Sequence, residues 1–309
     1  MSISLTRRQA LLAGAAAPIA ASIAASTPAR AAAPQKGVAI PKFNRVMLGE
    51  YEVTTLLAGT RPVPEPHGIF GLNVDDEEFA KVSADAFIPT DVAQFFFTPT
   101  LINTGSSLIL FDTGLSAEGT VAAVNAAGYE ADQIDTVVIT HMHGDHIGGL
   151  TDDAGHATFA NASYLTGRAE FDHWSGADND GFKAKVAPLA EKFSFLEDGD
   201  APVSGIHAMG AFGHTPGHMG YVVESGGKSL LIGADFANHY IWSVQHPDWE
   251  VRFDMDKAAA AKTRRKILDM LAAEKMPFIG YHMPFPGMGY IEAKDSAYRY
   301  VPASYQLVL

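Results

Sequence analysis

The sequence predicts an α/β fold for residues 43–309, and two observations support this prediction. Short apolar segments typical of buried strands alternate with amphipathic segments typical of helices along this whole region. Several strand-like segments end directly in histidine or aspartate, and α/β folds gather their sites at the carboxyl ends of strands. No break in composition and no internal repeat divides the region, so a single large domain is expected.

The N-terminal residues form a separate segment. Arg7 and Arg8 precede an alanine-rich apolar run that ends in Ala-Arg-Ala at Ala31. This layout predicts a cleaved signal peptide of the twin-arginine type over residues 1–31, and therefore a periplasmic or secreted protein. The apolar run is too weak to predict a membrane anchor. Residues 32–42 are expected to be a flexible leader.

Charge and cysteine content exclude several functions. Without its first 31 residues the chain has 19 Lys and Arg against 35 Asp and Glu, a formal charge of about −16. Such a surface repels nucleic acid and anionic membranes, so a small-molecule substrate is expected, neutral or cationic rather than polyanionic. The absence of cysteine excludes disulfides, zinc-thiolate sites and a cysteine nucleophile.

The N-terminal part of the domain combines strands with a long insertion. Residues 60–90 lose all periodicity, and a long irregular segment of this kind is typical of a lid or binding loop, or of a dimer contact. Apolar patterns predict the regular elements around it. These are strands at 43–49, 51–59, 93–105, 106–114 and 134–140, and a helix at 115–129.

The C-terminal part repeats the alternation of strands and helices. Asp254 or Asp256 is the expected N-cap of a long helix that ends at residue 275. The other predicted elements are a strand pair in 157–167, helical stretches at 168–174 and 183–193, and strands at 205–213, 220–226, 228–235 and 276–282.

A dense group of potential metal ligands follows one predicted strand. The sequence THMHGDH places His141, His143, Asp145 and His146 within six residues, and Gly144 lets the loop turn so that all four can meet. Neutral imidazoles and a carboxylate are the donors that zinc and similar first-row metals prefer. The segment therefore predicts a metal site.

Three further donors lie at a tight turn or at strand ends. In GHTPGH, Pro216 and Gly217 are expected to form a turn that fixes the direction of His218. Asp235 and His282 close the predicted strands LLIGAD and FIGYH. Seven donors exceed what one tetrahedral zinc ion binds, so the sequence predicts two metal ions that share a carboxylate.

These motifs resemble the metallo-β-lactamase superfamily of metallohydrolases. The resemblance covers residues 43–309 and includes FDTG with Asp112, HMHGDH, HTPGH and the two strand ends. It implies an αβ/βα four-layer sandwich with the metals at one edge. It also implies two divalent ions, zinc first, with manganese, cobalt or iron as alternatives.

The resemblance assigns a role to each donor. Asp112 would support the histidine loop, and Asp145 could accept or relay a proton from a hydroxide held between the metals. The implied ligands are His141, His143 and His218 for one metal, Asp145, His146 and His282 for the other, and Asp235 as the catalytic bridge.

Other segments resemble the methyl parathion hydrolase-like subgroup, above all PFPGMGYIEAKDSAYRYVPASY. This likeness implies a homodimer and a substrate pocket in which Trp174 and Phe182 grip an apolar group and Phe253 forms a wall. Asn238 stands where the parathion enzyme has an apolar residue and acyl-homoserine lactonases have a tyrosine, so it fits neither.

The implied function is hydrolysis of small esters, either organophosphate triesters or aryl esters. A lactonase, acting on acyl-homoserine lactones among others, is the alternative, with Tyr240 or Tyr221 in place of the missing tyrosine. Outside the hydrolases, the alternatives are an iron-dependent redox enzyme of the same fold and a non-enzymatic binding protein. Iron content would identify the former, and the complete set of ligand positions argues against the latter.

Overall fold

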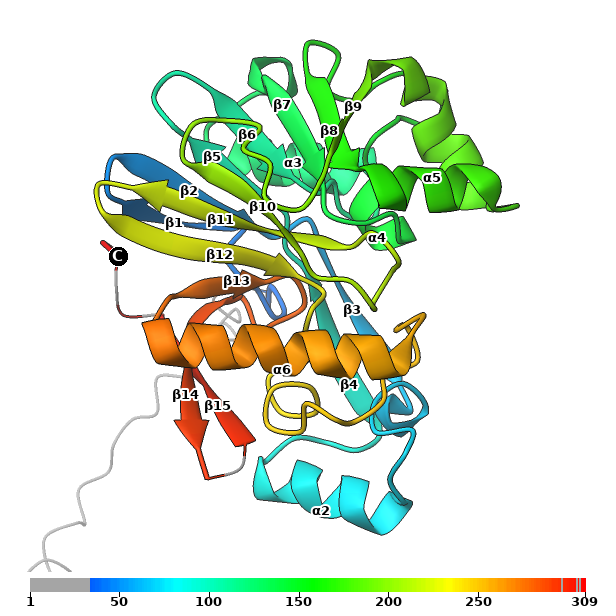
Figure 1. Ribbon diagram of the computed structural model, residues 1–309, viewed down its shortest axis with the longest axis vertical. Helices are drawn as coiled ribbons and strands as arrows, with labels where there is room; N and C mark the ends of the chain where they lie inside the picture. The colour runs from blue at the N-terminus through cyan, green and yellow to red at the C-terminus, as the bar shows by residue number, and fades with distance from the viewer. Residues whose placement is uncertain (1–33, 296, 304, 306) are drawn as a thin grey trace, which may run out of the picture. The chain divides into compact units, whose positions relative to one another are not determined.

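In the computed structural model, two mixed β-sheets pack against each other, and helices cover their outer faces (Figure 1). The structure describes residues 34–295, 297–303, 305 and 307–309. The predicted signal peptide lies outside the described residues, and residues 34–42 contain neither helix nor strand. No helix among the described residues has the length and apolar character that a membrane span requires.

The first sheet has seven strands in the order β1-β2-β5-β6-β7-β8-β9. Neighbours among β1, β2, β5 and β6 are antiparallel, and neighbours among β6, β7, β8 and β9 are parallel. The strands are β1 (Phe43–Leu48), β2 (Tyr51–Leu56), β5 (Thr100–Asn103), β6 (Leu108–Phe111), β7 (Thr136–Ile139), β8 (Ser163–Gly167) and β9 (Phe193–Leu196).

The second sheet has six strands in sequence order from β10 to β15. All neighbours are antiparallel except β12 and β13, which run parallel. The strands are β10 (Ile206–Gly210), β11 (Met219–Ser225), β12 (Lys228–Ala234), β13 (Phe278–Gly280), β14 (Met288–Lys294) and β15 (Ala297–Pro302).

Side chains of the central strands alternate between two apolar cores. Ile109 and Phe111 of β6 pack between the two sheets, and so does Val138 of β7. Leu110 and Val137, their neighbours in the chain, point to the other face of the sheet and join a core that includes residues of helix α3 (Ala117–Ala126). This alternation follows from the two-residue period of a strand, and it buries both faces of the sheet.

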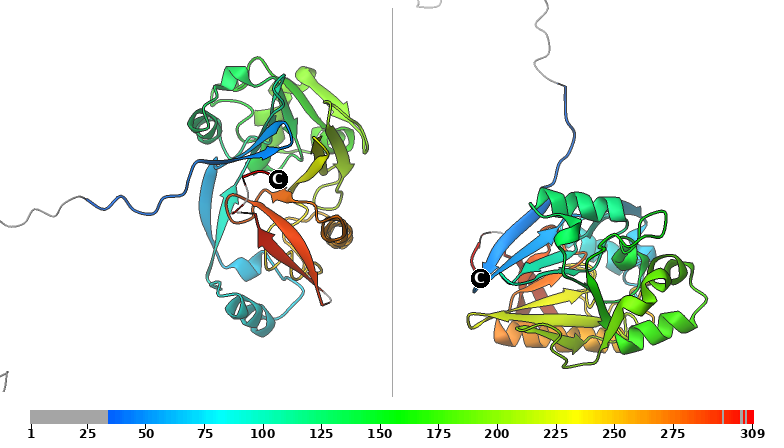
Figure 2. Two further views of the ribbon diagram at one scale, coloured as in Figure 1. Left: turned by 90° about the vertical axis from the view of Figure 1, so that its left-hand side faces the viewer. Right: turned by 90° about the horizontal axis from the view of Figure 1, so that it is seen from above.

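Helix α6 (Lys257–Glu274) covers the outer face of the second sheet. Asp256 caps its N-terminus by accepting a hydrogen bond from the backbone N–H of Ala259, as one of the two predicted caps. Ile267 and Leu271 pack against the sheet. Figure 2 shows α3 and α6 on opposite outer faces, so the predicted four-layer αβ/βα sandwich is confirmed.

The prediction that residues 60–90 are irregular is wrong. They include most of β3 (Gly59–Pro64), the short 3-10 turn η1 (Pro66–Gly68) and helix α2 (Asp76–Asp85). β3 forms a separate two-stranded sheet with β4 (Val92–Phe97). The prolines and acidic residues interrupt the apolar pattern from which strands and helices are predicted. The acidic residues occupy the first turn of α2, where negative charge interacts favourably with the helix dipole.

Three other boundaries differ from the prediction. The segment 93–105 is divided between β4 and β5, which belong to different sheets, and Pro99 lies at the division. The segment 157–167 holds one strand, β8, and not a pair. Residues 183–193 form the π-helical turn η3 (Phe182–Val186) and the 3-10 turn η4 (Ala187–Lys192), followed by β9. The two strands of the β14–β15 hairpin are missing from the prediction.

Helix α6 is fastened to the loops around it by a buried arginine. The guanidinium of Arg264 is fully buried and donates to the carboxylate of Asp254 (2.7 Å) and to the carbonyls of Phe236 and Pro247. Its neighbour Arg265 makes an exposed ion pair with Asp248. The two arginines therefore offer a matched comparison of a buried and an exposed ion pair.

We predict that Arg264→Met lowers the free energy of unfolding by about 3–5 kcal/mol, because it leaves the Asp254 carboxylate buried without its cation. Arg265→Met should cost about 0–1 kcal/mol, as exposed ion pairs do. Thermal unfolding followed by circular dichroism measures both, and the first Tm should fall by roughly 10 °C. Equal Tm values for the two variants would contradict this assignment.

Candidate metal centre

Four strand ends meet at one edge of the sandwich. β6 and β7 run parallel in one sheet, and β12 and β13 run parallel in the other, so each pair ends at the same edge of its sheet. The loops that follow these ends carry the predicted donors. Asp112 follows β6, the HMHGDH loop follows β7, Asp235 follows β12 and His282 lies two residues after β13.

Three imidazoles form the first group of donors. The Nδ1 atom of His143 lies 3.2 Å from Nε2 of His141 and 3.0 Å from Nε2 of His214. These three nitrogen atoms lie within 4.8 Å of one another. Tetrahedral sites use such a set of three imidazoles, with the fourth position left for another ligand.

Two imidazoles and a carboxylate form the second group. Nε2 of His282 lies 3.2 Å from Oδ2 of Asp145, and Nε2 of His146 lies 3.7 Å from the same oxygen. The sequence predicted this group correctly as a spatial cluster, since Asp145, His146 and His282 come together.

The carboxylate of Asp235 lies between the two groups. Its Oδ2 atom is 3.3 Å from Nε2 of His214 in the first group and 3.2 Å from Nε2 of His282 in the second. Its Oδ1 atom is 3.4 Å from Nε2 of His146. This is the position expected for a bridging ligand.

Two buried atoms of the cluster point to a cation. Nε2 of His146 and Oδ1 of Asp235 find no hydrogen-bond partner among the described residues, although both are buried. An unpartnered polar atom in the interior is costly, and a bound cation would satisfy both atoms at once. The donor set, imidazole with carboxylate, fits zinc or a similar divalent metal.

Hydrogen bonds from the far side fix the rings of three histidines. Nδ1 of His146 donates to Asp112 (2.8 Å), and Nδ1 of His214 donates to Asp254 (2.8 Å). Nδ1 of His282 donates to the carbonyl of Phe96 (2.9 Å). In each ring the Nε2 lone pair is thereby directed into the cluster, as is usual for metal-binding histidines.

Asp112 supports the histidine loop from a strained backbone position. Its φ angle is 61°, and its carboxylate accepts hydrogen bonds from the backbone N–H and the hydroxyl of Thr140 as well as from His146. The structure thus places Asp112 as the resemblance implied. Strain of this kind is common at functional sites.

The ligand predicted in the GHTPGH turn needs correction. Both ring nitrogens of His218 are bonded to the backbone: Nδ1 donates to the carbonyl of Ala211 (3.0 Å), and Nε2 accepts from the N–H of Asp235 (3.1 Å). No lone pair is left for a metal. His214, four residues earlier, takes its place in the cluster.

A fully buried carboxylate joins the two histidine segments. Oε1 of Glu170 accepts from the N–H of Met142 (2.8 Å) and from Nε1 of Trp174 (2.6 Å). Oε2 accepts from the hydroxyl of Thr215 (2.7 Å) and the N–H of Gly217 (3.0 Å). This role is missed by reasoning from sequence, because a glutamate in the first turn of helix α5 (Arg168–Gly176) is expected to be solvent-exposed.

Burial and neighbouring charges separate the two groups electrostatically. Burial, and then the charge of His214, lower the pKa of His143 to about 3. Burial also lowers the pKa of His282, but the carboxylates of Asp235 and Asp145 outweigh it and raise the value to about 10. The carboxylates therefore draw positive charge to the second group, as they would draw a cation.

A cavity of about 460 Å³ opens onto this cluster. Its floor includes His143, Asp145, Asp235 and His282. The side chain of Asp145 is 23 % exposed, whereas Asp235 is almost fully buried, so Asp145 faces the cavity more openly. The walls are Arg61, Val63, Ile69, Phe95, Phe97, Leu115, Arg252 and Phe253.

Of the four predicted pocket residues, only Phe253 lines this cavity. Phe182 packs in the core, edge to face with Phe171, and its assignment to the pocket is corrected. Asn238 is buried behind the cluster and donates to Oδ2 of Asp235 (2.9 Å), so it orients the bridge instead. Trp174 lies edge-on to His143 at 5.9 Å between ring centres, but it is not among the lining residues.

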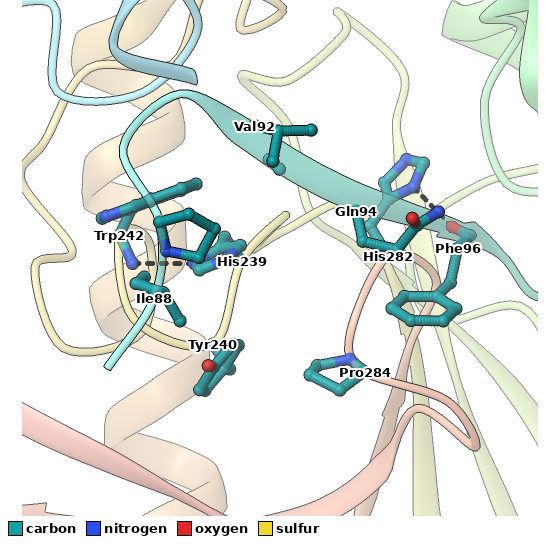
Figure 3. A pocket seen from close by; sticks show the side chains of 11 residues that line it. Ile88, Val92, Gln94, Phe96, His239, Tyr240, Trp242, His282 and Pro284 are labelled. Atoms are coloured by element: carbon teal, nitrogen blue, oxygen red, sulfur yellow. Dashed lines mark hydrogen bonds between the residues drawn. The ribbon is translucent and has the colours of Figure 1, made fainter. Parts of the chain in front are cut away.

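Neither tyrosine proposed to replace the lactonase tyrosine reaches the metal cavity. Tyr221 is fully buried in the core between the sheets. Tyr240 lines a second cavity, of about 270 Å³, which His282 borders from the other side. Figure 3 shows Tyr240 and His239 on one side of that cavity and His282, near Phe96, on the other.

We predict that Glu170→Gln weakens metal binding by about 10–100-fold. The amide N–H₂ group of glutamine cannot accept the hydrogen bonds that the carboxylate accepts from backbone and indole N–H groups, and these bonds position the ligand loops. Glu224→Gln, which alters an exposed carboxylate near His207, is the matched control and should leave affinity unchanged. Zinc competition with a chromogenic chelator measures the affinities. Wild-type affinity in the Glu170 variant would remove this residue from the metal centre.

A pair of alanine variants separates the two histidines of the GHTPGH turn. His214→Ala should lower the affinity for one metal by more than about 100-fold, since it removes a ligand rather than a ligand's partner. His218→Ala should lower it by at most about tenfold, since the His218 ring packs against His141 but both of its nitrogens are bonded to backbone groups. Metal content after dialysis, determined by mass spectrometry, gives the ranking, and the reverse order would restore His218 as the ligand.

Similar proteins of known structure share this architecture. AidC, described as a dizinc quorum-quenching lactonase in complex with the product N-hexnoyl-L-homoserine, is 27 % identical with a TM-score of 0.78, covering 85 % of this chain and 98 % of its own. The hydrolase AbOPH of the beta lactamase superfamily is 25 % identical with a TM-score of 0.80, covering 87 % and 100 %.

Curated relatives match over shorter stretches. An N-acyl homoserine lactonase of Bacillus sp is 25 % identical over 166 residues, which are 52 % of this chain and 61 % of the relative. The chain spans between 22 % and 61 % of the length of the curated relatives that it matches. The model of the metallo-beta-lactamase superfamily matches residues 98–275, more than half of the chain. Together with the four-layer fold and the convergence of histidines and aspartates at its edge, this match shows that the chain belongs to the metallo-beta-lactamase superfamily.

Proposed function

We propose that this chain is a two-metal hydrolase of small esters, with lactones as its preferred substrates. The observation that carries the proposal is the pair of donor groups around Asp235, which contain two unpartnered buried atoms and lie at a cavity with mainly apolar walls. Lactonases among the similar proteins favour a cyclic ester over an organophosphate. The likeness to the methyl parathion hydrolase-like subgroup stays a prediction.

The donor groups and the cavity have different roles in the proposed hydrolysis. Two divalent cations held by these donors would supply a water of lowered pKa and a charge that polarises a carbonyl oxygen. His141, His143 and His214 would hold one cation, and Asp145, His146 and His282 the other, with Asp235 shared. The apolar walls hold the acyl or ring carbons of the substrate and exclude water from them.

Asp145 is the residue best placed to move a proton. Its carboxylate reaches the cavity, and the charges of His146 and His282 outweigh the effect of burial and lower its pKa to about 2. The loop that carries it is held from below, because the Tyr281 hydroxyl donates to the Asp145 carbonyl (2.5 Å) and its ring lies over His146. Asp145 would accept the proton of the attacking water and return it to the leaving oxygen.

Aryl esters and organophosphate triesters are the second candidate class. No tyrosine lines the metal cavity among the described residues, whereas Phe95, Phe97 and Phe253 do. These rings would suit an aryl leaving group. We also propose export by the twin-arginine route, zinc as the metal, and a homodimer.

A substrate panel tests the proposed function. The zinc-loaded chain without residues 1–31 should hydrolyse γ-lactones or an acyl-homoserine lactone with higher kcat/KM than aryl esters, methyl parathion, paraoxon or a cephalosporin. Removal of the metals with a chelator should abolish turnover, and zinc should restore it, because the cations supply the nucleophile.

Two outcomes would contradict the proposal. A preparation with two zinc ions per chain that hydrolyses none of these compounds would exclude the ester hydrolase. Iron in the protein purified from cells grown with both metals, accompanied by consumption of oxygen, would favour the redox enzyme instead.

A further inference from the structure

Two arginines line the metal cavity. Arg61 lies on β3, opposite Phe95 of β4, and Arg252 precedes Phe253 in the loop before α6. The backbone of Arg252 is held to the same wall, since its N–H donates to the carbonyl of Ile69 (2.8 Å). Both arginines thus line the same cavity as Asp145 and Asp235.

Neither guanidinium makes an ion pair or a hydrogen bond in the described part of the chain, and that of Arg252 lies 5.3 Å from the ring centre of its neighbour Phe253. Arg61 and Arg252 make no ion pair within 4.0 Å and no side-chain hydrogen bond with any described residue, not even with the two aspartates on the cavity floor. Every other arginine that the structure describes makes an ion pair with a carboxylate or donates to a hydroxyl or a backbone carbonyl. These are Arg45, Arg168, Arg264, Arg265 and Arg299.

The position of these two charges is unusual in so acidic a chain. Residues 32–309 have a formal charge of about −16, which suggested neutral or cationic substrates. The two arginines are nevertheless the only charged residues that line the cavity outside the cluster of histidines and aspartates. With divalent cations on the floor, the cavity would attract anions although the surface repels them.

The cavity size limits what the anion can be. A volume of about 460 Å³ with walls of phenylalanine, valine, isoleucine and leucine accepts one small molecule with an apolar middle. A guanidinium matches the two oxygens of a carboxylate with two parallel hydrogen bonds. A carboxylate at the far end of a short acyl chain would reach the arginines while the ester lies at the cluster.

We propose that Arg61 and Arg252 form a carboxylate-binding subsite, so that the substrates of this centre are esters or lactones that carry a negative charge away from the scissile bond. This inference rests on the proposed function for the reaction itself. It goes beyond that function by naming the substrate class and the two residues that select it.

A matched pair of esters tests the subsite. The 4-nitrophenyl monoester of glutaric acid and 4-nitrophenyl valerate have acyl chains of equal length and differ in the terminal carboxylate. The zinc-loaded protein should prefer the anionic ester by about 10- to 100-fold in kcat/KM, the range of a charge-assisted hydrogen bond. Added salt should reduce the preference, because the arginines are exposed.

Variants assign the preference to the two arginines. Arg61→Gln and Arg252→Gln should each lower the ratio of the two kcat/KM values about tenfold, and the double variant should abolish the preference. Arg61→Lys should retain part of it, since the charge stays and the paired geometry is lost. Arg299→Gln, which removes an exposed guanidinium on β15, is the control and should keep the wild-type ratio of the two kcat/KM values.

Binding of unreactive analogues separates this inference from the proposed function. Calorimetry with the 4-nitroanilides of the same two acids should show tighter binding of the anionic one to wild type, and equal binding to the double variant. Equal binding of the two anilides to wild type would overturn the subsite, and so would a preference that survives in the double variant. If neither ester is hydrolysed but the anilide ranking holds, the proposed function fails and the subsite stands.

Discussion

The arrangement of the loops at the edge of the sandwich depends on one electrostatic constraint, which is the burial of several imidazoles around the carboxylate of Asp235. Asp235 lies between both groups of donors, and its Oδ1 has no partner in the described chain. Such a cluster is tolerable only with positive charge at its centre. The surrounding structure holds the donors in place before any cation arrives: Asp112, Asp254 and the carbonyl of Phe96 each fix one imidazole from behind.

These supports link the site to distant parts of the molecule. Asp254 accepts from His214 on one side and from Arg264 of α6 on the other, so the outer helix layer and the metal cluster share one carboxylate. Glu170 does the same for α5 by accepting from Met142 and Gly217 at once. Stability and metal affinity are therefore coupled through carboxylates that touch no substrate.

The sequence predicted the features that neighbouring residues determine, but not those that depend on contacts between residues distant in the chain. Two-residue alternation and the dense HMHGDH loop predicted the sheets and most of the cluster, because both patterns arise within a few neighbouring residues. His214 and His218 look alike in GHTPGH, and only their contacts with Asp254 and with the backbone distinguish them. Phe182 was placed in the pocket by resemblance, whereas packing against Phe171 decides its place.

The wall of the cavity is built on a core of its own. β3, β4 and α2 pack around Phe70, Phe79, Trp242 and Trp249, a cluster separate from the cores of the two sheets. The Trp242 indole also donates a hydrogen bond to the hydroxyl of Ser83, and this bond links α2 to the rest of the cluster. β4 also supports the metal cluster, because the carbonyl of Phe96 accepts from His282 and the rings of Phe95 and Phe97 pack edge-on against the His282 ring. In a lineage with this architecture, a substitution at Phe95 or Phe97 that admits a new substrate also changes the packing of one candidate metal ligand.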